Sequence, residues 1–296
     1  MRGILLAGGS GTRLGPLTRG VSKHLLPVHD KPLVYYPLSV LMLAGIRDIL
    51  LISTRAHLAG FLALLGDGGR LGLNLSYAVQ RAPEGIAQAL TIGADHIGDG
   101  PVALALGDNI FHGTGFPSLL RRHTSDVDGC VVFGYPVEDP ERYGVGEVDA
   151  AGRLVSLVEK PAVPRSSLAI TGLYLYGNDV VAIARGLRPS ARGELEITDV
   201  NRVYVEQGRA RFVPLGQDAA WFDTGTHDAL SQAGRYVQAM ERDRGVHIGC
   251  VEEIAFGLGY IDADALHALG SAYGGSAYGA RLKKIAAGTE DREGSV

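Results

Sequence analysis

Short apolar runs alternate with helical segments through the first 110 residues, and this alternation constrains the fold more than any other feature. The runs that we predict as strands are residues 2–7, 48–54, 74–80 and 102–108. The segments that we predict as helices are residues 31–46, 57–68 and 85–98. Pro32 suits the first turn of the first helix, and Gly45 suits its end. Such a pattern is typical of a mostly parallel sheet with helices on both faces. We therefore expect an α/β, Rossmann-like fold, with ligands beyond the carboxyl ends of the strands.

The pattern changes after about residue 130. The predicted elements there are a strand at 129–137, a hairpin at 144–161 that turns at 149–152, a strand at 170–176, helices at 179–187 and 196–208, a strand at 210–215 and a long helix at 226–245. Helical fragments follow, and residues 288–296 are predicted to form a frayed tail. We expect one α/β domain over 1–240, whose two parts meet at residue 130, and a helical extension with a flexible tail over 241–296.

Composition and charge disfavour several classes of protein. The chain has 296 residues, a formal net charge of −4 and no basic tail, whereas nucleic-acid binding normally needs a basic face. No apolar run reaches the roughly 18 residues of a membrane span, and the N-terminus lacks the pattern of a secretion signal. Cys130 and Cys250 have no metal-type spacing, and two buried thiols suit a reducing compartment. We expect a cytoplasmic protein that binds neither nucleic acid nor membrane.

The loop after the first strand is rich in glycine. It reads LLAGGSGTRLGPLTRGVSKHLLP over residues 5–27. The dinucleotide fingerprint G-x-G-x-x-G fails because Leu14 stands at the third glycine, which disfavours an oxidoreductase. The P-loop pattern fails because Val21 stands where lysine is required. The loop is therefore interpreted as a different phosphate cradle, in which Gly8, Gly9 and Gly11 allow successive N–H groups to point at an anion.

Two cations follow these glycines within one short segment. Arg13 supplies a planar, bidentate donor, and Lys23 supplies a compact positive charge. The alternative is a tight strand-to-helix turn with a solvated arginine.

Polar residues elsewhere have the chemistry of a nucleotide site. Asp108 ends an apolar strand and Asp223 lies in WFDTGTH, and carboxylates are ligands that Mg²⁺ prefers. A lone aspartate at a strand end more often caps the next helix. In VQRAPEGIAQAL, the amide of Gln80 can pair with the edge of thymine or uracil, and Gly85 allows the backbone to approach a base.

Eight stretches, taken in order, resemble those of one enzyme family. They are LLAGGSGTRL with SKHLLPV, DKPLVYYPLSVLMLAGIRDILLIST, LGDNIF, DPERYGVGEVD, VEKP, TGLYLY, RGELEITDVN and WFDTGTHDAL. The set resembles the sugar-1-phosphate nucleotidylyltransferases, and the glucose-1-phosphate thymidylyltransferases in particular, from residue 2 to about residue 285. The opening stretch alone is moderately specific, whereas the ordered set is highly specific.

The resemblance implies a reaction and its requirements. Glucose 1-phosphate and dTTP would give dTDP-glucose and pyrophosphate, with Mg²⁺ as cofactor, by direct attack of the sugar phosphate on the α-phosphorus. This chemistry depends on positioning and on neutralisation of charge. It needs no general base, because the attacking phosphate oxygen is already ionised. Members of the family are homotetramers, so we expect a homotetramer here.

The resemblance also implies the site residues. Arg13 and Lys23 would stabilise the transition state, and Asp108 and Asp223 would hold the metal. The expected nucleotide-binding residues are Leu6, Gly8, Gly9, Gly11, Thr12, Arg13, Gln80, Pro83, Gly85 and Asp108. The expected sugar-phosphate-binding residues are Asn109, Tyr143, Gly144, Glu159, Lys160, Ile170, Thr171, Tyr174 and Arg192. The part over 1–130 would then bind the nucleotide and the part over 131–240 the sugar phosphate.

Glu159 and Lys160 are neighbours in a predicted strand. Their side chains would point to opposite faces if the strand were regular. The nearby Pro161 indicates that it is irregular, so that both side chains can reach one cleft.

The sequence departs from the family in one stretch and at four single positions. After LGDNIF it reads HGTGFPSLL, without the Tyr-Gly-His order that is common in relatives. Residue 24 is His where Gln is frequent, and residue 15 is Gly where an aromatic residue is common. Residue 146 is Gly where Val is usual, and residue 170 is Ile where Val is usual.

Three alternative functions stay open. The enzyme could use UTP, or it could act on an amino-sugar phosphate. A non-catalytic nucleotide-sugar sensor on the same fold is the alternative from another class. The presence of Asp108, Asp223, Arg13 and Lys23 together argues against the sensor.

Overall fold

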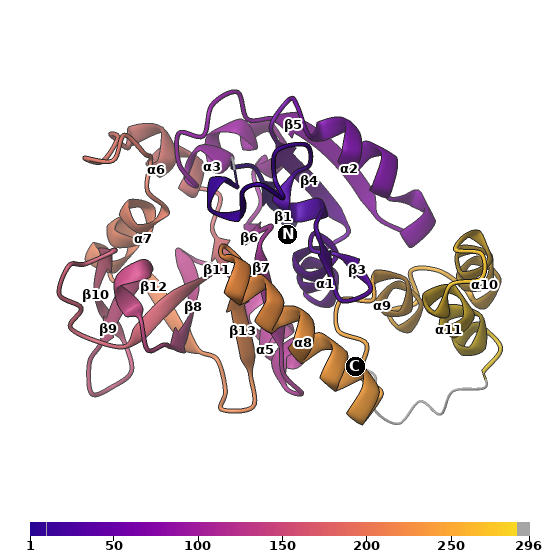
Figure 1. Ribbon diagram of the computed structural model, residues 1–296. Helices are drawn as coiled ribbons and strands as arrows, with labels where there is room; N and C mark the ends of the chain where they lie inside the picture. Colours follow the sequence, from indigo (N-terminus) through magenta and orange to yellow (C-terminus); the bar gives the residue numbers. More distant parts are fainter. Residues whose placement is uncertain (10, 289–296) are drawn as a thin grey trace.

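Nine strands form the central sheet among the residues that the computed structural model describes, which are 1–9 and 11–288 (Figure 1). The strands are β1 (Arg2–Ala7), β4 (Asp48–Ser53), β5 (Asn74–Val79), β6 (Val102–Leu106), β8 (Cys130–Pro136), β9 (Gly144–Val148), β10 (Leu154–Glu159), β11 (Leu168–Tyr176) and β12 (Ala210–Pro214). Their order is β10-β9-β11-β6-β1-β4-β5, and β8 pairs with both β11 and β12. Two small ladders lie outside this sheet: β2 (Pro27–Val28) with β3 (Lys31–Pro32), and β7 (Asn109–His112) with β13 (Ala220–Asp223).

Strand direction brings several strand ends to one edge of the sheet. β1 is parallel to β4 and β6, and β4 is parallel to β5, so the carboxyl ends of all four lie together. β11 runs antiparallel to β6, with Leu173 opposite Ala105, so the first half of β11 lies at that same edge. The predicted α/β fold with a mostly parallel sheet is confirmed. Strands that run in opposite directions both contribute residues to this edge of the sheet.

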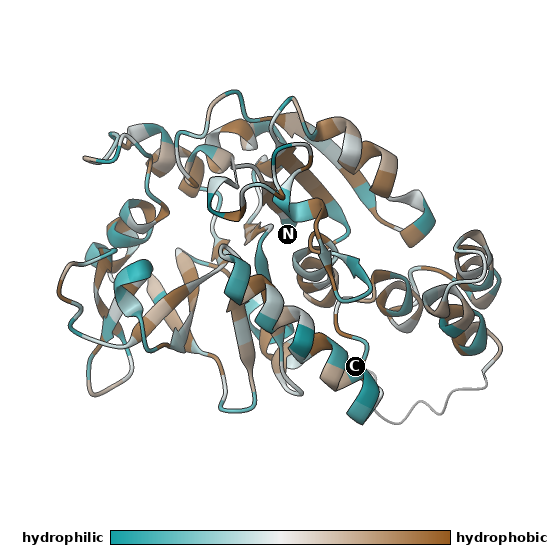
Figure 2. Cartoon of the chain, in the orientation of Figure 1, coloured by the Kyte–Doolittle hydropathy of each residue, from teal (hydrophilic) through white to brown (hydrophobic). Residues whose placement is uncertain are grey.

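Helices cover both faces of the sheet (Figure 1). They are α1 (Tyr35–Leu43), α2 (Leu58–Leu65), α3 (Gln88–Ile92), α4 (Ala94–Ile97), α5 (Phe116–Thr124), α6 (Val180–Gly186), α7 (Ile197–Glu206), α8 (His227–Arg244), α9 (Val251–Gly257), α10 (Ala263–Ala272) and α11 (Ala277–Ala286). Alternate residues of β1 pack into two cores: Leu5 packs with residues of α1, α2, α5 and α9, and Ile4 packs with residues of α3, α4, α6 and α7. This double burial explains the continuous apolar runs, which form the brown centre of Figure 2.

Two predicted helices differ from the structure. The first begins at Tyr35, because Lys31 and Pro32 pair with β2 instead of entering the helix. Its end is as predicted, with Gly45 at φ +79° just beyond it. The segment predicted as one helix at 85–98 forms α3 and α4, which are separated at Gly93. A side chain at Gly93 would place its Cβ 2.6 Å from Cδ1 of Ile4, so this glycine allows the segment to pack closely on β1.

The predicted helical extension is confirmed in α9, α10 and α11. Its helices are joined to one another through a buried acid: Glu252 of α9 accepts hydrogen bonds from the hydroxyls of Tyr273 (2.6 Å) and Tyr278. Most of the predicted tail, residues 289–296, lies outside the described residues. The division into parts at residue 130 stays a prediction, and the central sheet takes strands from both parts.

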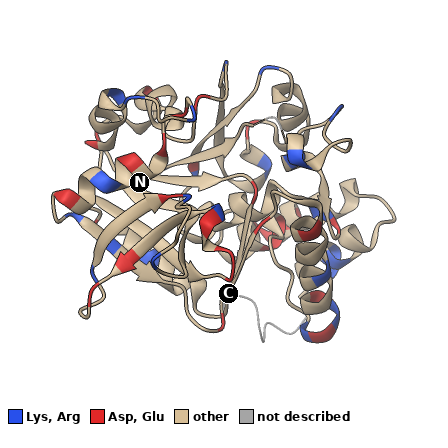
Figure 3. Cartoon of the chain, turned by 60° about the vertical axis from the view of Figure 1, so that its left-hand side comes forward, with Lys and Arg blue, Asp and Glu red and all other residues tan. Residues whose placement is uncertain are grey.

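The surface elements carry charges of both signs. Figure 3 shows acidic and basic residues interspersed over the elements seen from that side. None of the described helices has the length and apolar character that crossing a bilayer requires.

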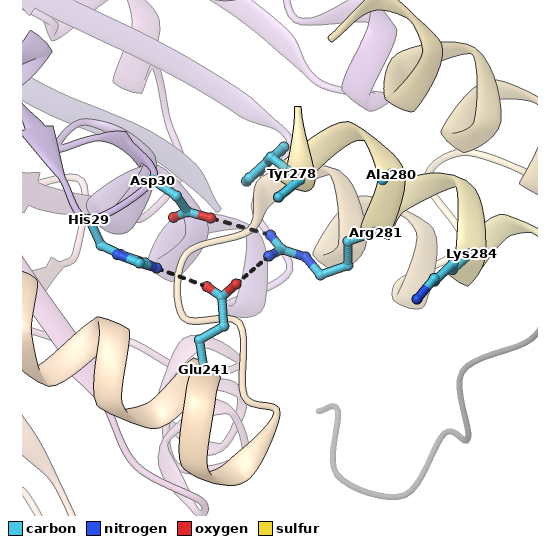
Figure 4. A pocket seen from close by; sticks show the side chains of 8 residues that line it. His29, Asp30, Glu241, Tyr278, Ala280, Arg281 and Lys284 are labelled. Atoms are coloured by element: carbon cyan, nitrogen blue, oxygen red, sulfur yellow. Dashed lines mark hydrogen bonds and ion pairs between the residues drawn. The ribbon is translucent and has the colours of Figure 1, made fainter. Parts of the chain in front are cut away.

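A charged network joins the extension to the N-terminal part of the chain (Figure 4). Arg281 of α11 binds Glu241 of α8, with Nη1 2.8 Å from Oε1, and approaches Asp30, with Nη2 3.6 Å from Oδ2. The guanidinium lies over the ring of Tyr278, and Nε2 of His29 is 3.4 Å from Oε2 of Glu241. These side chains line a hollow of about 520 Å³. None of its lining residues is predicted from the sequence to take part in the reaction, so we interpret the network as structural.

Replacing Arg281 with methionine tests this interpretation. The side chain is only 10% exposed, so Arg281→Met keeps much of its packing but leaves Glu241 without its arginine, while Asp30 keeps its ion pair with Lys31. We expect the free energy of unfolding in urea to fall by about 2–4 kcal/mol. The matched control is Arg235→Met on the exposed face of α8, with an expected change within about 0.5 kcal/mol. Equal stability of the two variants would contradict a structural role for the network.

Candidate active site

Two aspartates that are far apart in sequence meet at the edge of the sheet. Asp108 directly precedes β7, and Asp223 is the last residue of β13, opposite Asn109 in the ladder. The backbone N–H and the hydroxyl of Thr224 both donate to the carbonyl of Asp108, at 3.0 and 2.8 Å. The small ladder therefore positions the two carboxylates beside each other.

The two carboxylates have opposite pKa shifts. Nζ of Lys23 donates a hydrogen bond to the carboxylate of Asp108. Burial disfavours the ionised form of Asp108, but the charge of Lys23, the nearby His24 and the hydrogen bonds from Lys23 and Asn109 together outweigh burial and hold the pKa of Asp108 below its ordinary value. For Asp223, burial and then the negative charge of Asp108 raise the pKa to about 6. The site thus holds one firmly ionised carboxylate beside one that resists ionisation.

Two arginines flank Asp223. A Cβ at Gly225 would lie 2.9 Å from Nη2 of Arg13 and 3.3 Å from Oδ1 of Asp223, so the missing side chain leaves room for the arginine. Nη2 of Arg142 is 4.0 Å from Oδ2 of Asp223. Arg142 was not predicted as a site residue, although it lies within DPERYGVGEVD and precedes the predicted Tyr143. Together with Lys23, these residues form a site with three cationic side chains and two carboxylates.

The glycine loop has the unusual backbone that its composition predicts. Gly9 and Gly11 have φ angles of +94° and +59°, in the region that other residues rarely adopt. The hydroxyl of Thr18 donates to the carbonyl of Gly11 at 2.8 Å and closes the loop. Thr12 begins a short 3-10 helix, and the N–H of Gly107 donates to the carbonyl of Leu6 at 2.9 Å. This bond ties the start of the loop to the segment that carries Asp108.

The residues predicted to bind the base lie beside the loop. A Cβ at Gly8 would be only 2.2 Å from Oε1 of Gln80, which is buried. Gly85 has φ +108°, and a Cβ there would be 2.3 Å from the carbonyl oxygen of Leu195. Close packing against Leu195 is thus a second reason for glycine at this position. Pro83 is exposed.

Three of the predicted sugar-phosphate residues form an ionic cluster. Oε1 of Glu159 lies 3.8 Å from Nζ of Lys160 and 3.7 Å from Nη2 of Arg192. The φ angle of +43° at Lys160 breaks the strand, so its side chain and that of Glu159 lie on the same side. Thr198 donates to Oε2 of Glu159, and a Cβ at Gly144 would lie 3.1 Å from the Thr198 hydroxyl.

Asn109 links Asp108 to β11. Its Nδ2 donates to Oδ1 of Asp108 at 3.0 Å. Its Oδ1 accepts from the N–H of Gly172 at 3.0 Å and from the indole N–H of Trp221 at 2.6 Å. The Asn109 side chain thus orients Asp108 from the inside of the fold. The ring of Tyr143 packs edge-on against Trp221, with 5.2 Å between centroids.

The remaining predicted residues lie on β11. Ile170, Thr171 and Tyr174 are all buried. The Thr171 hydroxyl oxygen makes no hydrogen bond within the described part of the chain. Burial, then the charges of Glu159 and Asp108, raise the pKa of Tyr174, so both carboxylates lie near enough to act on this residue. The structure therefore brings the predicted phosphate, base and sugar residues along one edge of the sheet.

Comparison with known proteins identifies the family. The family model of nucleotidyl transferases matches residues 2–239. This chain belongs to the nucleotidyl transferase family. The glucose-1-phosphate thymidylyltransferase of Mycolicibacterium smegmatis is 58% identical over 266 residues, which cover 90% of this chain and 92% of the relative. That of Xanthomonas campestris is 53% identical over 285 residues, which cover 96% and 97%.

Solved structures agree with the family. A Bacillus anthracis protein assigned as a glucose-1-phosphate thymidylyltransferase, in complex with sucrose, has a TM-score of 0.74 and 39% identity, covering 80% of this chain and 94% of that protein. A UDP-glucose pyrophosphorylase bound to UDP-glucose has a TM-score of 0.70 and 25% identity, covering 79% and 97%. The chain is an enzyme, a nucleotidyltransferase, and the predicted membership of the glucose-1-phosphate thymidylyltransferases is confirmed.

His24, one of the departures from the family, should make the fold sensitive to acid. His24 is buried, and burial, with the charge of Lys23, lowers its pKa to about 3. In the unfolded chain a histidine ionises near pH 6.5. Between these values the unfolded state binds one more proton, so this residue destabilises the fold by about 1.4 kcal/mol for each unit that the pH falls.

The variant His24→Gln should lose this dependence. Because only the wild type loses stability through residue 24 in acid, we expect the free energy of unfolding of the variant, minus that of the wild type, to increase on going from pH 6 to pH 4. Urea denaturation at several pH values measures the difference. The reference is pH 8, where His24 is neutral in both the folded and the unfolded protein. Parallel curves for the two proteins would show that His24 does not carry the acid sensitivity.

Proposed function

We propose that the chain transfers a thymidylyl group from dTTP to α-D-glucose 1-phosphate and releases dTDP-glucose and pyrophosphate. The names of its relatives support this reaction. The single observation that carries the proposal is the arrangement of three cationic side chains around two carboxylates at the carboxyl ends of parallel strands. Such a site can neutralise a triphosphate while holding a divalent cation.

The aspartate pair fits Mg²⁺. Asp108 and Asp223 offer hard oxygen ligands, and their mutual repulsion, seen in the raised pKa of Asp223, would be relieved by a dication. When bound, Mg²⁺ would supply positive charge that stabilises the phosphate oxygens of the transition state.

The side chains have distinct roles in the proposed mechanism. Arg13, Lys23 and the N–H groups of the glycine loop bind the triphosphate and stabilise the charge that develops on it. An oxygen of the sugar phosphate forms a bond to the α-phosphorus while the bond from this phosphorus to the β-phosphate oxygen breaks. Pyrophosphate leaves with the electron pair, and no proton needs to be removed. Arg142, near Asp223, would add a third cation at this centre.

The sugar phosphate is assigned to the ionic cluster. Lys160 and Arg192 bind its phosphate, and Glu159 accepts hydrogen bonds from sugar hydroxyls. Nucleotide binding is thereby assigned to residues 1–130 and sugar-phosphate binding to 131–240. We also propose a cytoplasmic homotetramer. The unpaired state of Cys130 and Cys250 supports a reducing compartment, and the family resemblance supports the tetramer.

Two substrate alternatives follow from the site. The amide of Gln80 can pair with uracil as well as with thymine, since both bases present the same hydrogen-bonding edge, so UTP is the alternative nucleotide. An amino-sugar phosphate is the alternative acceptor. Release of pyrophosphate from each nucleoside triphosphate, with glucose 1-phosphate or glucosamine 1-phosphate, decides among them. Absence of release with dTTP and glucose 1-phosphate would overturn the proposed function.

The variant Asp223→Asn tests the metal assignment. We expect kcat to fall by about 100-fold or more, because a carboxylate ligand and its charge are lost. The melting temperature should be unchanged or higher, since the repulsion from Asp108 is removed. Asp218→Asn, on the exposed loop before β13, is the matched control and should keep wild-type activity. Undiminished turnover by Asp223→Asn at saturating Mg²⁺ would show that this residue is not a metal ligand.

A further inference from the structure

Three side chains, two amides and one carboxylate, form a hydrogen-bonded relay from the residue proposed to bind the base to the surface. Nε2 of Gln80 donates to Oε1 of Gln88 at 2.7 Å, and Nε2 of Gln88 donates to Oε2 of Glu84 at 2.6 Å. Gln80 is buried, Gln88 is half-buried and Glu84 is exposed. The relay therefore extends from the inside of the proposed nucleotide site to solvent.

The carboxylate of Glu84 fixes the direction of both hydrogen bonds in this relay. An ionised carboxylate only accepts hydrogen bonds, so the group that Gln88 turns toward Glu84 must be its NH₂. Oε1 of Gln88 then faces Gln80 and needs a donor. Gln80 can supply that donor only through Nε2. The negative charge of Glu84 thus determines on which side the nitrogen and the oxygen of the buried Gln80 amide lie.

The direction matters because the two ends of the Gln80 amide present different chemistry. Oε1 faces Gly8 of the glycine loop, where no side chain intervenes. The amide offers an acceptor at Oε1 and the second N–H of Nε2 as a donor. Thymine and uracil present a donor at N3 and an acceptor at O4, which match this order. Cytosine presents an acceptor at N3 and a donor at N4, which match the amide only after a 180° flip.

We propose that Glu84 and Gln88 are positioning residues that lock the orientation of the Gln80 amide and so make the enzyme reject cytosine nucleotides. This inference rests on the proposed function, since it takes Gln80 to read the base. Neither Glu84 nor Gln88 needs to touch the nucleotide.

Few other contacts hold the amide in this orientation. The carbonyl of Gly85 also lies near Nε2 of Gln80, but at 3.4 Å it is a long and weak acceptor. The backbone of the loop is held independently of the Glu84 side chain. The N–H of Leu195 donates to the carbonyl of Glu84 at 2.7 Å, and the N–H of Ala87 donates to the carbonyl of Leu195 at 3.1 Å. A change of side chain at residue 84 therefore alters the relay while leaving the loop in place.

Three variants test the relay by the ratio of kcat/KM for dTTP to kcat/KM for dCTP, measured as pyrophosphate release with glucose 1-phosphate. Glu84→Gln removes the acceptor-only group, so both orientations of the amides become available. Gln88→Met interrupts the relay with a side chain of similar size. Glu84→Lys replaces an acceptor by a donor and favours the reversed relay. Both nucleotides carry the same triphosphate, so effects of charge on phosphate binding cancel in this ratio.

We expect the wild type to prefer dTTP strongly, and the first two variants to lose about 10-fold or more of this preference. Glu84→Lys should lose the most, with a higher kcat/KM for dCTP than the wild type. The decrease of kcat/KM for dTTP should result from a higher KM, because a base contact is made equally in the ground state and the transition state. The control Glu206→Gln, an exposed residue at the end of α7, should keep the wild-type ratio.

The outcomes separate this proposal from the proposed function. A wild type that releases no pyrophosphate from dTTP overturns the function. An active wild type whose preference survives in all three variants, with melting temperatures near that of the wild type, overturns the relay alone. A reduced kcat with an unchanged dTTP-to-dCTP ratio would assign Glu84 a purely structural role and would also overturn the relay.

Discussion

Two half-buried carboxylates are held side by side in this fold, and the rest of the site depends on that unfavourable contact. Burial and then the negative charge of Asp108 raise the pKa of Asp223, whereas the cation Lys23 helps to keep Asp108 ionised. The β7–β13 ladder, the hydrogen bonds from Thr224 and the amide of Asn109 supply the rigidity that resists the repulsion. The surrounding arginines then compensate the charge, and the same arrangement is the one that the proposed binding of a cation and a polyanion requires.

The sequence predicts the scaffold well because burial on both faces leaves a direct record in the residues. In the parallel part, β1, β4 and β6 contain continuous apolar runs, and each helix between the strands has turn residues at its ends. The small ladder of β7 and β13 was missed because it has four residues on each side and no distinctive alternation. The start of α1 was misplaced because Pro32 is equally acceptable in a first helical turn and in a short edge strand.

The sequence predicts those site residues whose type and local pattern are specific. It does not predict those that join the site only because the fold brings them close to other site residues. Glycines with positive φ, and aspartates at strand ends, can be recognised in sequence. Arg142 could not be distinguished from any surface arginine, because only the fold brings it within 4.0 Å of Asp223. The departures from the family at Gly146 and Ile170 also acquire a meaning only in three dimensions. A Cβ at Gly146 would lie 3.1 Å from Cδ1 of Ile170, so the larger side chain fills space that the smaller one leaves.

The length of chain between the two aspartates has a consequence for the order in which the enzyme is assembled. They are 223 − 108 = 115 positions apart, so the aspartate pair is a contact of very high sequence separation. During synthesis, Lys23 and Asp108 can pair as soon as β1 and β6 have joined, whereas Asp223 has not yet left the ribosome. The lysine is therefore the first counter-ion that Asp108 meets, and it stabilises the half-built site until β13 arrives. The proposed metal site, which needs both aspartates, is therefore completed only after residue 223 has been synthesised.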